Sequence, residues 1–432
     1  MNRPLSNIWK QRLIFWIGAI IVGLVIVTMT SLSEWAAQIY RSLTQKYLWF
    51  HFIVTPIGLG LTSWLTYRFF PGSERSGIPQ VKTALRIADN IHARCKLVSL
   101  QIVLGKLLLP IMGLLCGATV GFGGPAVHVG ASIMLSLGKF IKFPAHFMDK
   151  GLILAGSAAG FAAMFSTPLA GIVFAIEELS TSLEERISNL VLIAIILAGV
   201  TAFMLMHNYV YFQIEPTIIP LGSAWYAIPL CGITGGLFGG IFSKSLILGS
   251  RFFKWTGLPI VVTAILCGGI IALVNYYSND LTAGTGYQYT KNILHDLQPI
   301  DTAYPFLKFL TTCATFFSGI PSGIFVPSLA IGAGLGVDLA SWIPIAPASA
   351  MILLTMSAYF AGVLQKPLTA FVIVMEMTNS HQLLIPLMAT AFLASGASKL
   401  VQPIPLYLAL CETYLPHLEN HASTQKKTVN NV

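Results

Sequence analysis

Charged residues are scarce in this sequence, and acidic ones are the scarcest. Its 432 residues include 25 Lys or Arg and 16 Asp or Glu, so 9% of the chain is charged while 55% is hydrophobic. Soluble globular domains usually carry about 25% charged residues, and the shortage excludes a protein whose surface lies wholly in water. The net charge of +9 does not indicate a nucleic-acid partner, because the basic residues gather in short connections between apolar runs.

Paired cysteines and metal-ligand spacings are missing as well. The cysteines form no CxxC pair and so give no basis for a disulfide framework or a zinc site. They are Cys95, Cys116, Cys231, Cys267, Cys313 and Cys411. The histidines show no HExxH spacing. We therefore expect neither a metal nor a cofactor, and we do not expect an enzyme.

Long apolar runs make up most of the chain instead. A helix needs about 20 apolar residues to cross a bilayer. Runs near that length occupy residues 13–30, 48–67, 100–120, 152–176, 190–206, 225–248, 258–277, 303–317, 323–345, 350–375 and 383–397. This pattern predicts an all-α polytopic membrane protein. Basic residues gather at 68–96 and near the end of the chain, so the positive-inside rule predicts that this connection and both termini are cytoplasmic.

The two halves of the chain repeat two landmarks in the same order. The segments PAVHVGA and PSLAIGA start 202 positions apart, and PLAGIVFAIE and PLTAFVIVME start 199 positions apart. Many transporters are built from such repeats, with the substrate site between them. The spacing leaves open whether the repeats are parallel or inverted. The predicted organisation is one transmembrane domain at 1–412, with repeats at about 48–206 and 225–410, and a short polar cytoplasmic tail at 413–432 in place of a cytosolic regulatory domain.

Three short segments place glycine just ahead of a proline and an apolar helix: SGIP at 76–79, GFGGP at 121–125 and GIFVP at 323–327. Proline suits the first turn of a helix, and glycine permits a sharp approach to it. A helix N-terminus attracts anions through its free N–H groups and its dipole. Each segment alone favours an ordinary Gly/Pro kink, but three together favour an anion site without Lys or Arg.

These segments resemble the CLC family of chloride channels and chloride/proton antiporters. The Glu-Glu pair after PLAG, the EMT segment at 376–378 and PLY at 405–407 follow in the family's order, so the resemblance runs from residue 75 to about 410. It implies a CLC-type fold of two inverted repeats with tilted and broken helices, and a homodimer whose subunits each hold a pore. It also implies chloride as the transported ion, contact with membrane lipid and, without a cytosolic module, a bacterial inner membrane.

The resemblance further implies which residues contact chloride. The implied ligands are hydroxyls and backbone amides, namely Ser76, Tyr407, Ile324 and Phe325 at a central site and Phe122, Gly123 and Gly124 at an outer one. Such donors dehydrate chloride at modest cost. Taken alone, Ser76 is more simply an N-cap and Tyr407 an interfacial aromatic. Glu178 matches the family's internal proton glutamate, and we interpret it as a relic in preference to a salt-bridge partner.

One position departs from the family pattern. The pattern for the second segment is G-x-E-G-P, whereas GFGGP here places Gly123 where the family has its gating glutamate and external proton acceptor. Residues 97–148 contain no Asp or Glu to replace it. With no carboxylate to compete with chloride or to carry protons, we predict passive chloride movement uncoupled from protons.

Two alternatives remain open. A chloride/proton antiporter would need another proton acceptor. His128 is the titratable residue near the gap, although we expect it to be packed or hydrogen-bonded. A membrane-embedded hydrolase would use Ser322 or Ser76 as nucleophile, but neither has a GxSxG setting. Arg75 replaces the first glycine of the family's GSGIP at the expected cytoplasmic mouth, and GTGYQ at 284–288 is expected to be a surface turn.

Overall fold

A computed structural model describes residues 5–87, 94, 96–138, 145–180, 188–206, 211–212, 214–215, 217–296 and 302–412. Within these ranges regular structure is helical, and the β-bridges are isolated pairs, so the predicted all-α fold is confirmed. The predicted tail at 413–432 lies outside the described residues, and Cys95 does as well.

The helices differ widely in length. The first half contains α1 (Leu5–Lys46), α2 (Phe50–Phe69), α3 (Ile78–Arg86), α5 (Leu100–Leu115), α6 (Gly123–Gly138), α7 (Ala145–Phe165), α8 (Pro168–Phe174), the π-helical turn η1 (Ala175–Leu179) and α9 (Asn189–Leu205). The second half contains η2 (Ser223–Tyr226), α10 (Ala227–Thr256), α11 (Ile260–Tyr277), α12 (Tyr287–Asp296), α13 (Tyr304–Phe317), α14 (Phe325–Trp342), α15 (Ala348–Leu364), α16 (Pro367–Thr378), η3 (His381–Leu383), α17 (Leu384–Val401) and α18 (Leu406–Cys411).

These lengths confirm tilted and broken helices. In the described ranges, five helical stretches are long and apolar enough to cross a membrane. The 42 residues of α1 would extend about 63 Å, roughly twice the thickness of a bilayer's hydrocarbon core, so this helix must tilt or project beyond it. By contrast, α3, α8 and α18 have 9, 7 and 6 residues and are too short to cross a bilayer.

Two apolar runs that look continuous in the sequence are broken in the structure. Residues 152–176 divide at Ser166 (φ 53°) into α7 and α8, and residues 350–375 divide at Gln365 (φ 56°) into α15 and α16. A left-handed residue ends the first helix of each pair, and a proline then begins the second. Neither run is therefore a single span, and the two breaks lie at equivalent places in the two halves.

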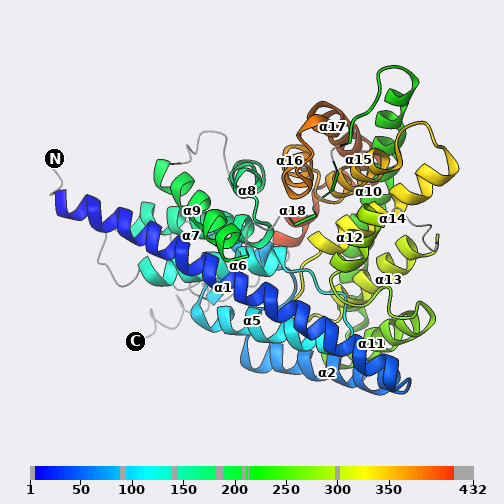
Figure 1. Cartoon of the computed structure of the whole chain (residues 1–432). Coiled ribbons are helices and arrows are strands. Elements are labelled where there is room, and N and C mark those ends of the chain that lie inside the picture. The colour runs from blue at the N-terminus through cyan, green and yellow to red at the C-terminus, as the bar shows by residue number, and fades with distance from the viewer. Residues whose placement is uncertain are drawn as a thin grey trace.

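The two halves meet in a reciprocal contact between α8 and α16, which lie side by side in Figure 1. The backbone N–H groups of Leu169 and Ala170 donate to the Glu376 carboxylate at 3.1 and 2.8 Å. Those of Leu368 and Thr369 donate to Glu177 at 3.2 and 2.7 Å. Each repeat thus supplies the carboxylate that caps a helix of the other, as expected of inverted repeats related by a two-fold axis.

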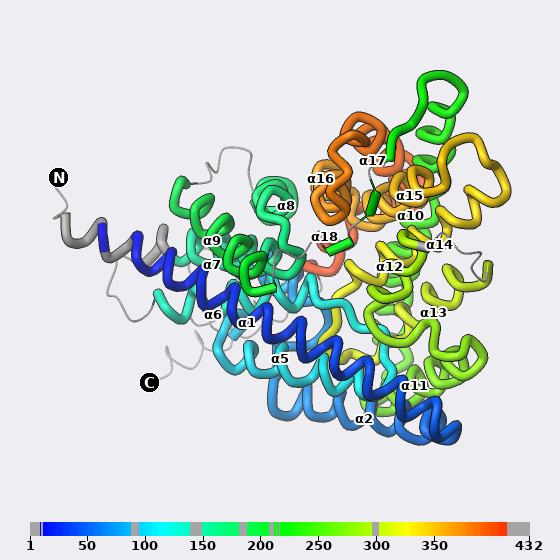
Figure 2. The backbone as a smooth tube through the Cα atoms, viewed as in Figure 1, coloured from blue at the N-terminus to red at the C-terminus, as the bar shows by residue number. Residues whose placement is uncertain are grey.

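The long helix α1 connects the two sides of the molecule. In Figures 1 and 2 it runs from the group formed by α6, α7 and α9 toward α2 and α11, which lie together at the lower edge. The second-half helices α10, α13, α14, α15 and α17 form the other side. The short helix α18, which carries the predicted chloride ligand Tyr407, lies between the two groups.

Candidate functional site

The three glycine-proline segments converge through backbone hydrogen bonds. Gly121 and Gly323 exchange N–H···O bonds of 3.0 and 2.6 Å. The Arg75 N–H donates to the Ile320 carbonyl at 3.1 Å, and the Ser322 N–H donates to the Arg75 carbonyl at 3.0 Å. The N-termini of α3, α6 and α14 therefore meet at one junction. The prediction that these segments act together rather than as separate kinks is consistent with this arrangement.

The two predicted hydroxyl ligands meet at the same junction. Ser76 donates a hydrogen bond to the Tyr407 hydroxyl at 3.5 Å, and the two residues are only 1% and 2% exposed. Gly124 lies directly against this pair, since a Cβ atom there would be 2.1 Å from Ser76 Oγ. The Phe325 ring lies 6.2 Å from that of Tyr407. Residues from α3, α6, α14 and α18 thus pack against one another at this buried point.

Gly123 faces aromatic rings and not open space. A Cβ atom there would be 2.8 Å from Cδ2 of Phe325 and 3.1 Å from Cζ of Phe165. Phe325 also packs edge-on against Phe161 and Phe360. A larger residue at position 123 would therefore have to displace a ring by a few tenths of an ångström.

The backbone at Arg75 has a conformation that glycine adopts more easily than other residues. Arg75 has φ 54° and Gly77 has φ 95°, both in the left-handed region, which costs a residue with a side chain about 1–2 kcal/mol. The Arg75 guanidinium lies over the Phe316 ring at 5.2 Å. It lines a pocket of about 460 Å³ together with Arg251 and Lys254. Glu74 lines the same pocket, so three cationic side chains accompany one carboxylate there.

His128 is fully buried and engaged. Its Nε2 donates to the Leu97 carbonyl at 2.6 Å, and a Cβ atom at Gly77 would be 2.6 Å from its Nδ1. The expectation of a packed, hydrogen-bonded histidine agrees with this position. The hydroxyl of Ser76 binds Tyr407 while His128 binds Leu97, so these two residues do not form the Ser–His pair that a hydrolase requires.

Two buried lysines were missed because they lie within apolar runs. Lys106 on α5 donates to the Arg75 carbonyl, next to Ser76. Lys308 on α13 donates to the carbonyls of Thr282 and Gly284 at 2.7 and 2.8 Å. Gly284 is itself buried and precedes α12, so the predicted surface turn at 284–288 is wrong. Each lysine donates to backbone carbonyls of an irregular segment elsewhere in the chain. The residues around each lysine in the sequence therefore do not indicate its partner.

Glu178 lies near the α3 and α18 end of the junction. Its carboxylate is 2.5 Å from the Lys82 ammonium, and the residue is 3% exposed. Both line a pocket of about 150 Å³ that also includes Leu408, next to Tyr407. The salt-bridge interpretation of Glu178 is the one the geometry supports. Its neighbour Glu177 points to α16 instead, where it accepts hydrogen bonds from the N–H groups of Leu368 and Thr369.

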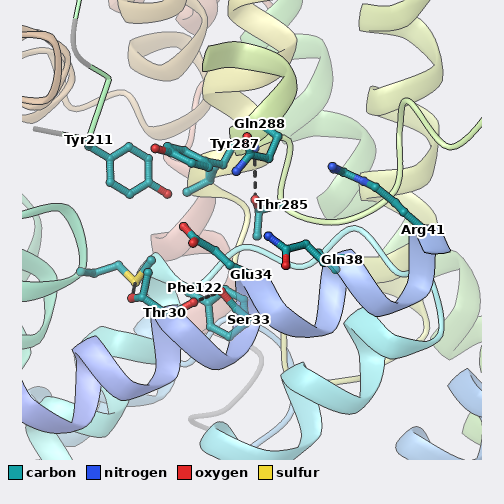
Figure 3. Close-up of a pocket in the computed structure, with 13 residues that line it drawn as sticks. Thr30, Ser33, Glu34, Gln38, Arg41, Phe122, Tyr211, Thr285, Tyr287 and Gln288 are labelled. Carbon is teal, nitrogen blue, oxygen red and sulfur yellow. Dashed lines mark hydrogen bonds between the residues drawn. The ribbon is translucent and has the colours of Figure 1, made fainter. Parts of the chain in front are cut away.

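A third pocket adjoins the junction at the α6 and α14 end (Figure 3). It has a volume of about 260 Å³. Phe122 and Val326, beside Gly123 and Phe325, form part of its wall, and α1 forms one side with Glu34 and Arg41. This pocket and the one at Glu178 share no lining residue. The junction is thus approached from two separate ends, as a transport path requires.

These features define a polytopic helical membrane protein with helix N-termini meeting between two inverted repeats. Residues 57–399 match the family described as "Voltage gated chloride channel". The chain belongs to this family, and the CLC resemblance of its motifs is confirmed. The H(+)/Cl(-) exchange transporter ClcA of Vibrio vulnificus strain YJ016 is 29% identical over 383 residues, covering 84% of this chain and 79% of that protein. The protein of that name from strain CMCP6 matches equally.

Solved structures share the fold. A slow cyanobacterial Cl−/H+ antiporter matches with a TM-score of 0.78 and 24% identity, over 93% of this chain and 98% of its own. A CLC-type fluoride/proton antiporter gives 0.77 and 22%, over 94% and 99%. A eukaryotic CLC transporter gives 0.74 and 18%, over 94% and 74%. At these identities the likeness establishes the CLC-type fold.

Proposed function

We propose that the protein moves chloride across a membrane through the junction of α3, α6, α14 and α18. The observation that carries this proposal is the convergence of three helix N-termini on the buried hydroxyls of Ser76 and Tyr407. Such a junction offers an anion hydrogen-bond donors and a favourable dipole potential. Conduction also requires binding weak enough for release, and neutral donors meet that requirement.

In this proposal the donors are arranged along the path. Ser76, Tyr407 and the amides of Ile324 and Phe325 hold a central chloride. The amides of Phe122, Gly123 and Gly124, at the start of α6, face an outer chloride beside the larger pocket. Arg75, Arg251 and Lys254, which line a separate pocket beside the start of α3, would raise the local anion concentration.

Chloride/proton exchange is the mode that the relatives favour. The Vibrio vulnificus proteins are named as exchange transporters, and two of the similar solved structures are antiporters. Exchange also needs groups that bind protons within the protein. Glu178 is such a group at one end of the junction, where it is buried and paired with Lys82.

Uncoupled conduction is the second candidate, and Gly123 favours it. Position 123 carries no carboxylate, and the space beside it is bounded by Phe325 and Phe165. Chloride at an outer site would meet no competing side-chain charge from this position. The prediction of passive transport rests on this one residue, whereas the names of the relatives favour exchange.

Flux through liposomes distinguishes the two modes. Purified protein is reconstituted, a chloride gradient is imposed, and chloride and pH electrodes are read together. Uphill proton movement driven by chloride supports exchange, and its loss in Glu178→Gln with chloride flux retained would assign Glu178 to the proton path. Chloride efflux with valinomycin but without proton movement supports the uncoupled mode. Absence of chloride flux contradicts both.

We also propose that the protein is a homodimer in a bacterial inner membrane, with both termini cytoplasmic. The family resemblance supports the dimer, and the basic segment at 68–96 supports the orientation. Light scattering in detergent should give twice the mass of one chain. Cysteine labelling of intact cells at the two termini should require permeabilisation.

A further inference from the structure

The pocket of about 260 Å³ beside α1 contains a carboxylate that the proposed path does not yet use. Figure 3 shows Glu34 projecting from α1 into this pocket, on the side that Phe122 also borders. Phe122 precedes Gly123, and Val326 follows Phe325, so the pocket adjoins the start of both α6 and α14. Glu34 therefore stands at the opening through which an anion would reach the outer site.

Glu34 is partly buried, and no hydrogen bond to another described residue holds its carboxylate in place. Ser33 donates to the Thr30 carbonyl at 2.7 Å, and Thr30 donates to the Ile26 carbonyl at 3.0 Å, so these hydroxyls are engaged within α1. No hydrogen bond or ion pair within 4 Å joins Glu34 to another residue in the described ranges. Because Glu34 is only partly buried, its carboxylate can exchange a proton with the solvent.

The ionisable groups around Glu34 come from three elements. Arg41 lies two turns along α1 on the same wall, and Lys291 of α12 is within electrostatic reach. Tyr287 of α12 and Tyr211 face the carboxylate across the pocket (Figure 3). The helices α6, α7 and α14 contribute Phe122, Met164 and Val326, which do not ionise. Glu34 is thus the acidic group among the residues that line this pocket.

We propose that Glu34 is the outer proton-binding carboxylate of the chloride path, placed by α1 beside the position where Gly123 offers none. This inference rests on the proposed function. When ionised, Glu34 repels chloride from the outer site. When it takes a proton from water, the repulsion disappears and chloride reaches the amides of α6. A proton held there can return to the outer solution or pass inward, so the residue serves either mode of transport.

The test measures chloride flux from liposomes at matched internal and external pH between 4.5 and 8, with the pH changed on both sides together. For wild-type protein we expect flux to rise as the pH falls, by on the order of tenfold, because protonation removes one negative charge that opposes chloride. In Glu34→Gln the flux should stay at the acid level throughout. Glu34→Asp should retain a pH dependence, because it keeps a carboxylate in the pocket.

Glu215→Gln is the matched control, since Glu215 is exposed, lies four positions after Tyr211 and does not line the pocket. It should behave as wild type. An unchanged pH dependence in Glu34→Gln, with chloride flux intact, would overturn the assignment of Glu34 while leaving chloride transport standing. Absence of chloride flux in the wild type would instead overturn the proposed function and this inference with it.

Discussion

At the scale of single residues, Ser76 and Tyr407 define the buried centre of the junction. They come from α3 and α18, 331 positions apart, and share one hydrogen bond. A chloride between them would accept a hydrogen bond from each hydroxyl, and a hydrogen bond to a charged partner contributes about 1.5–3 kcal/mol. These two hydroxyls are therefore the first place to measure anion affinity.

We expect Tyr407→Phe to weaken chloride binding roughly tenfold or more, because it removes one charge-assisted donor without changing the ring. Isothermal titration calorimetry of the detergent-solubilised protein measures this. Tyr359→Phe is the matched control, since Tyr359 is equally buried but lies on α15. Equal affinity in Tyr407→Phe and wild type would remove Tyr407 from the site.

Gly123→Glu should slow chloride flux at neutral pH on the order of tenfold and make it rise on acidification, because the new carboxylate competes with chloride until protonated. Gly123→Ala controls for volume, since any side chain there meets the Phe325 ring. Liposome flux between pH 4.5 and 8 measures both variants. The same pH profile in the two would show that charge at this position does not govern the path.

Sequence reasoning predicted chloride ligands only where local motifs mark them, and it did not single out residues that folding brings to the junction from elsewhere. Ser76, Gly123 and Phe325 sit in short glycine-proline segments whose chemistry is readable. Glu34 and Lys106 lie in no such motif. Their places become clear only in the fold, where α1 borders the pocket beside Phe122 and α5 brings Lys106 to the Arg75 carbonyl. The residues around Glu34 in the sequence do not indicate that its helix will border the proposed outer chloride site.

At the scale of elements, the reciprocal caps of α8 and α16 are the clearest long-range result. The repeated acids at 177 and 376 were visible in the sequence, but the partner of each was not. Their hydrogen bonds cross 192 and 206 positions. The breaks at Ser166 and Gln365 were also hidden, because hydropathy does not register a single left-handed residue inside an apolar run.

Glu376→Gln and Glu177→Gln should each destabilise the protein by about 1–2 kcal/mol, because each replaces a charged helix cap with a neutral one. Thermal unfolding in detergent should show midpoints lowered by about 1–3 °C. Glu412→Gln, at an exposed position after α18, is the control. Midpoints equal to wild type in both variants would show that these caps add little.

At the scale of the whole molecule, the two repeats form one structural unit. The caps join them at α8 and α16, and α1 adds further links, since Asn275 of α11 donates to the Tyr40 hydroxyl at 3.3 Å and Thr44 donates to Asp280 at 2.6 Å. The backbone bonds between the segments at Gly121 and Gly323 complete the connection. Separating the halves would leave the groups in these hydrogen bonds without their partners.

The chain should therefore unfold in a single transition. Partial unfolding of one repeat would strip the caps and the junction bonds from the other, which makes an intermediate with one folded half unfavourable. Differential scanning calorimetry in detergent, with fluorescence followed in parallel, tests this. Two resolved transitions, or probes that disagree in midpoint, would contradict it.

The exchanged caps also have a consequence for inheritance. Although the two halves resemble copies of one ancestral segment, a substitution at Glu177 first harms a helix encoded about 190 residues downstream. Selection would then act on Glu177 and Glu376 as a pair, because each caps a helix in the other repeat. After the loss of one carboxylate, we expect compensating substitutions in the helix that this carboxylate capped. We do not expect them in the helix that carried the carboxylate.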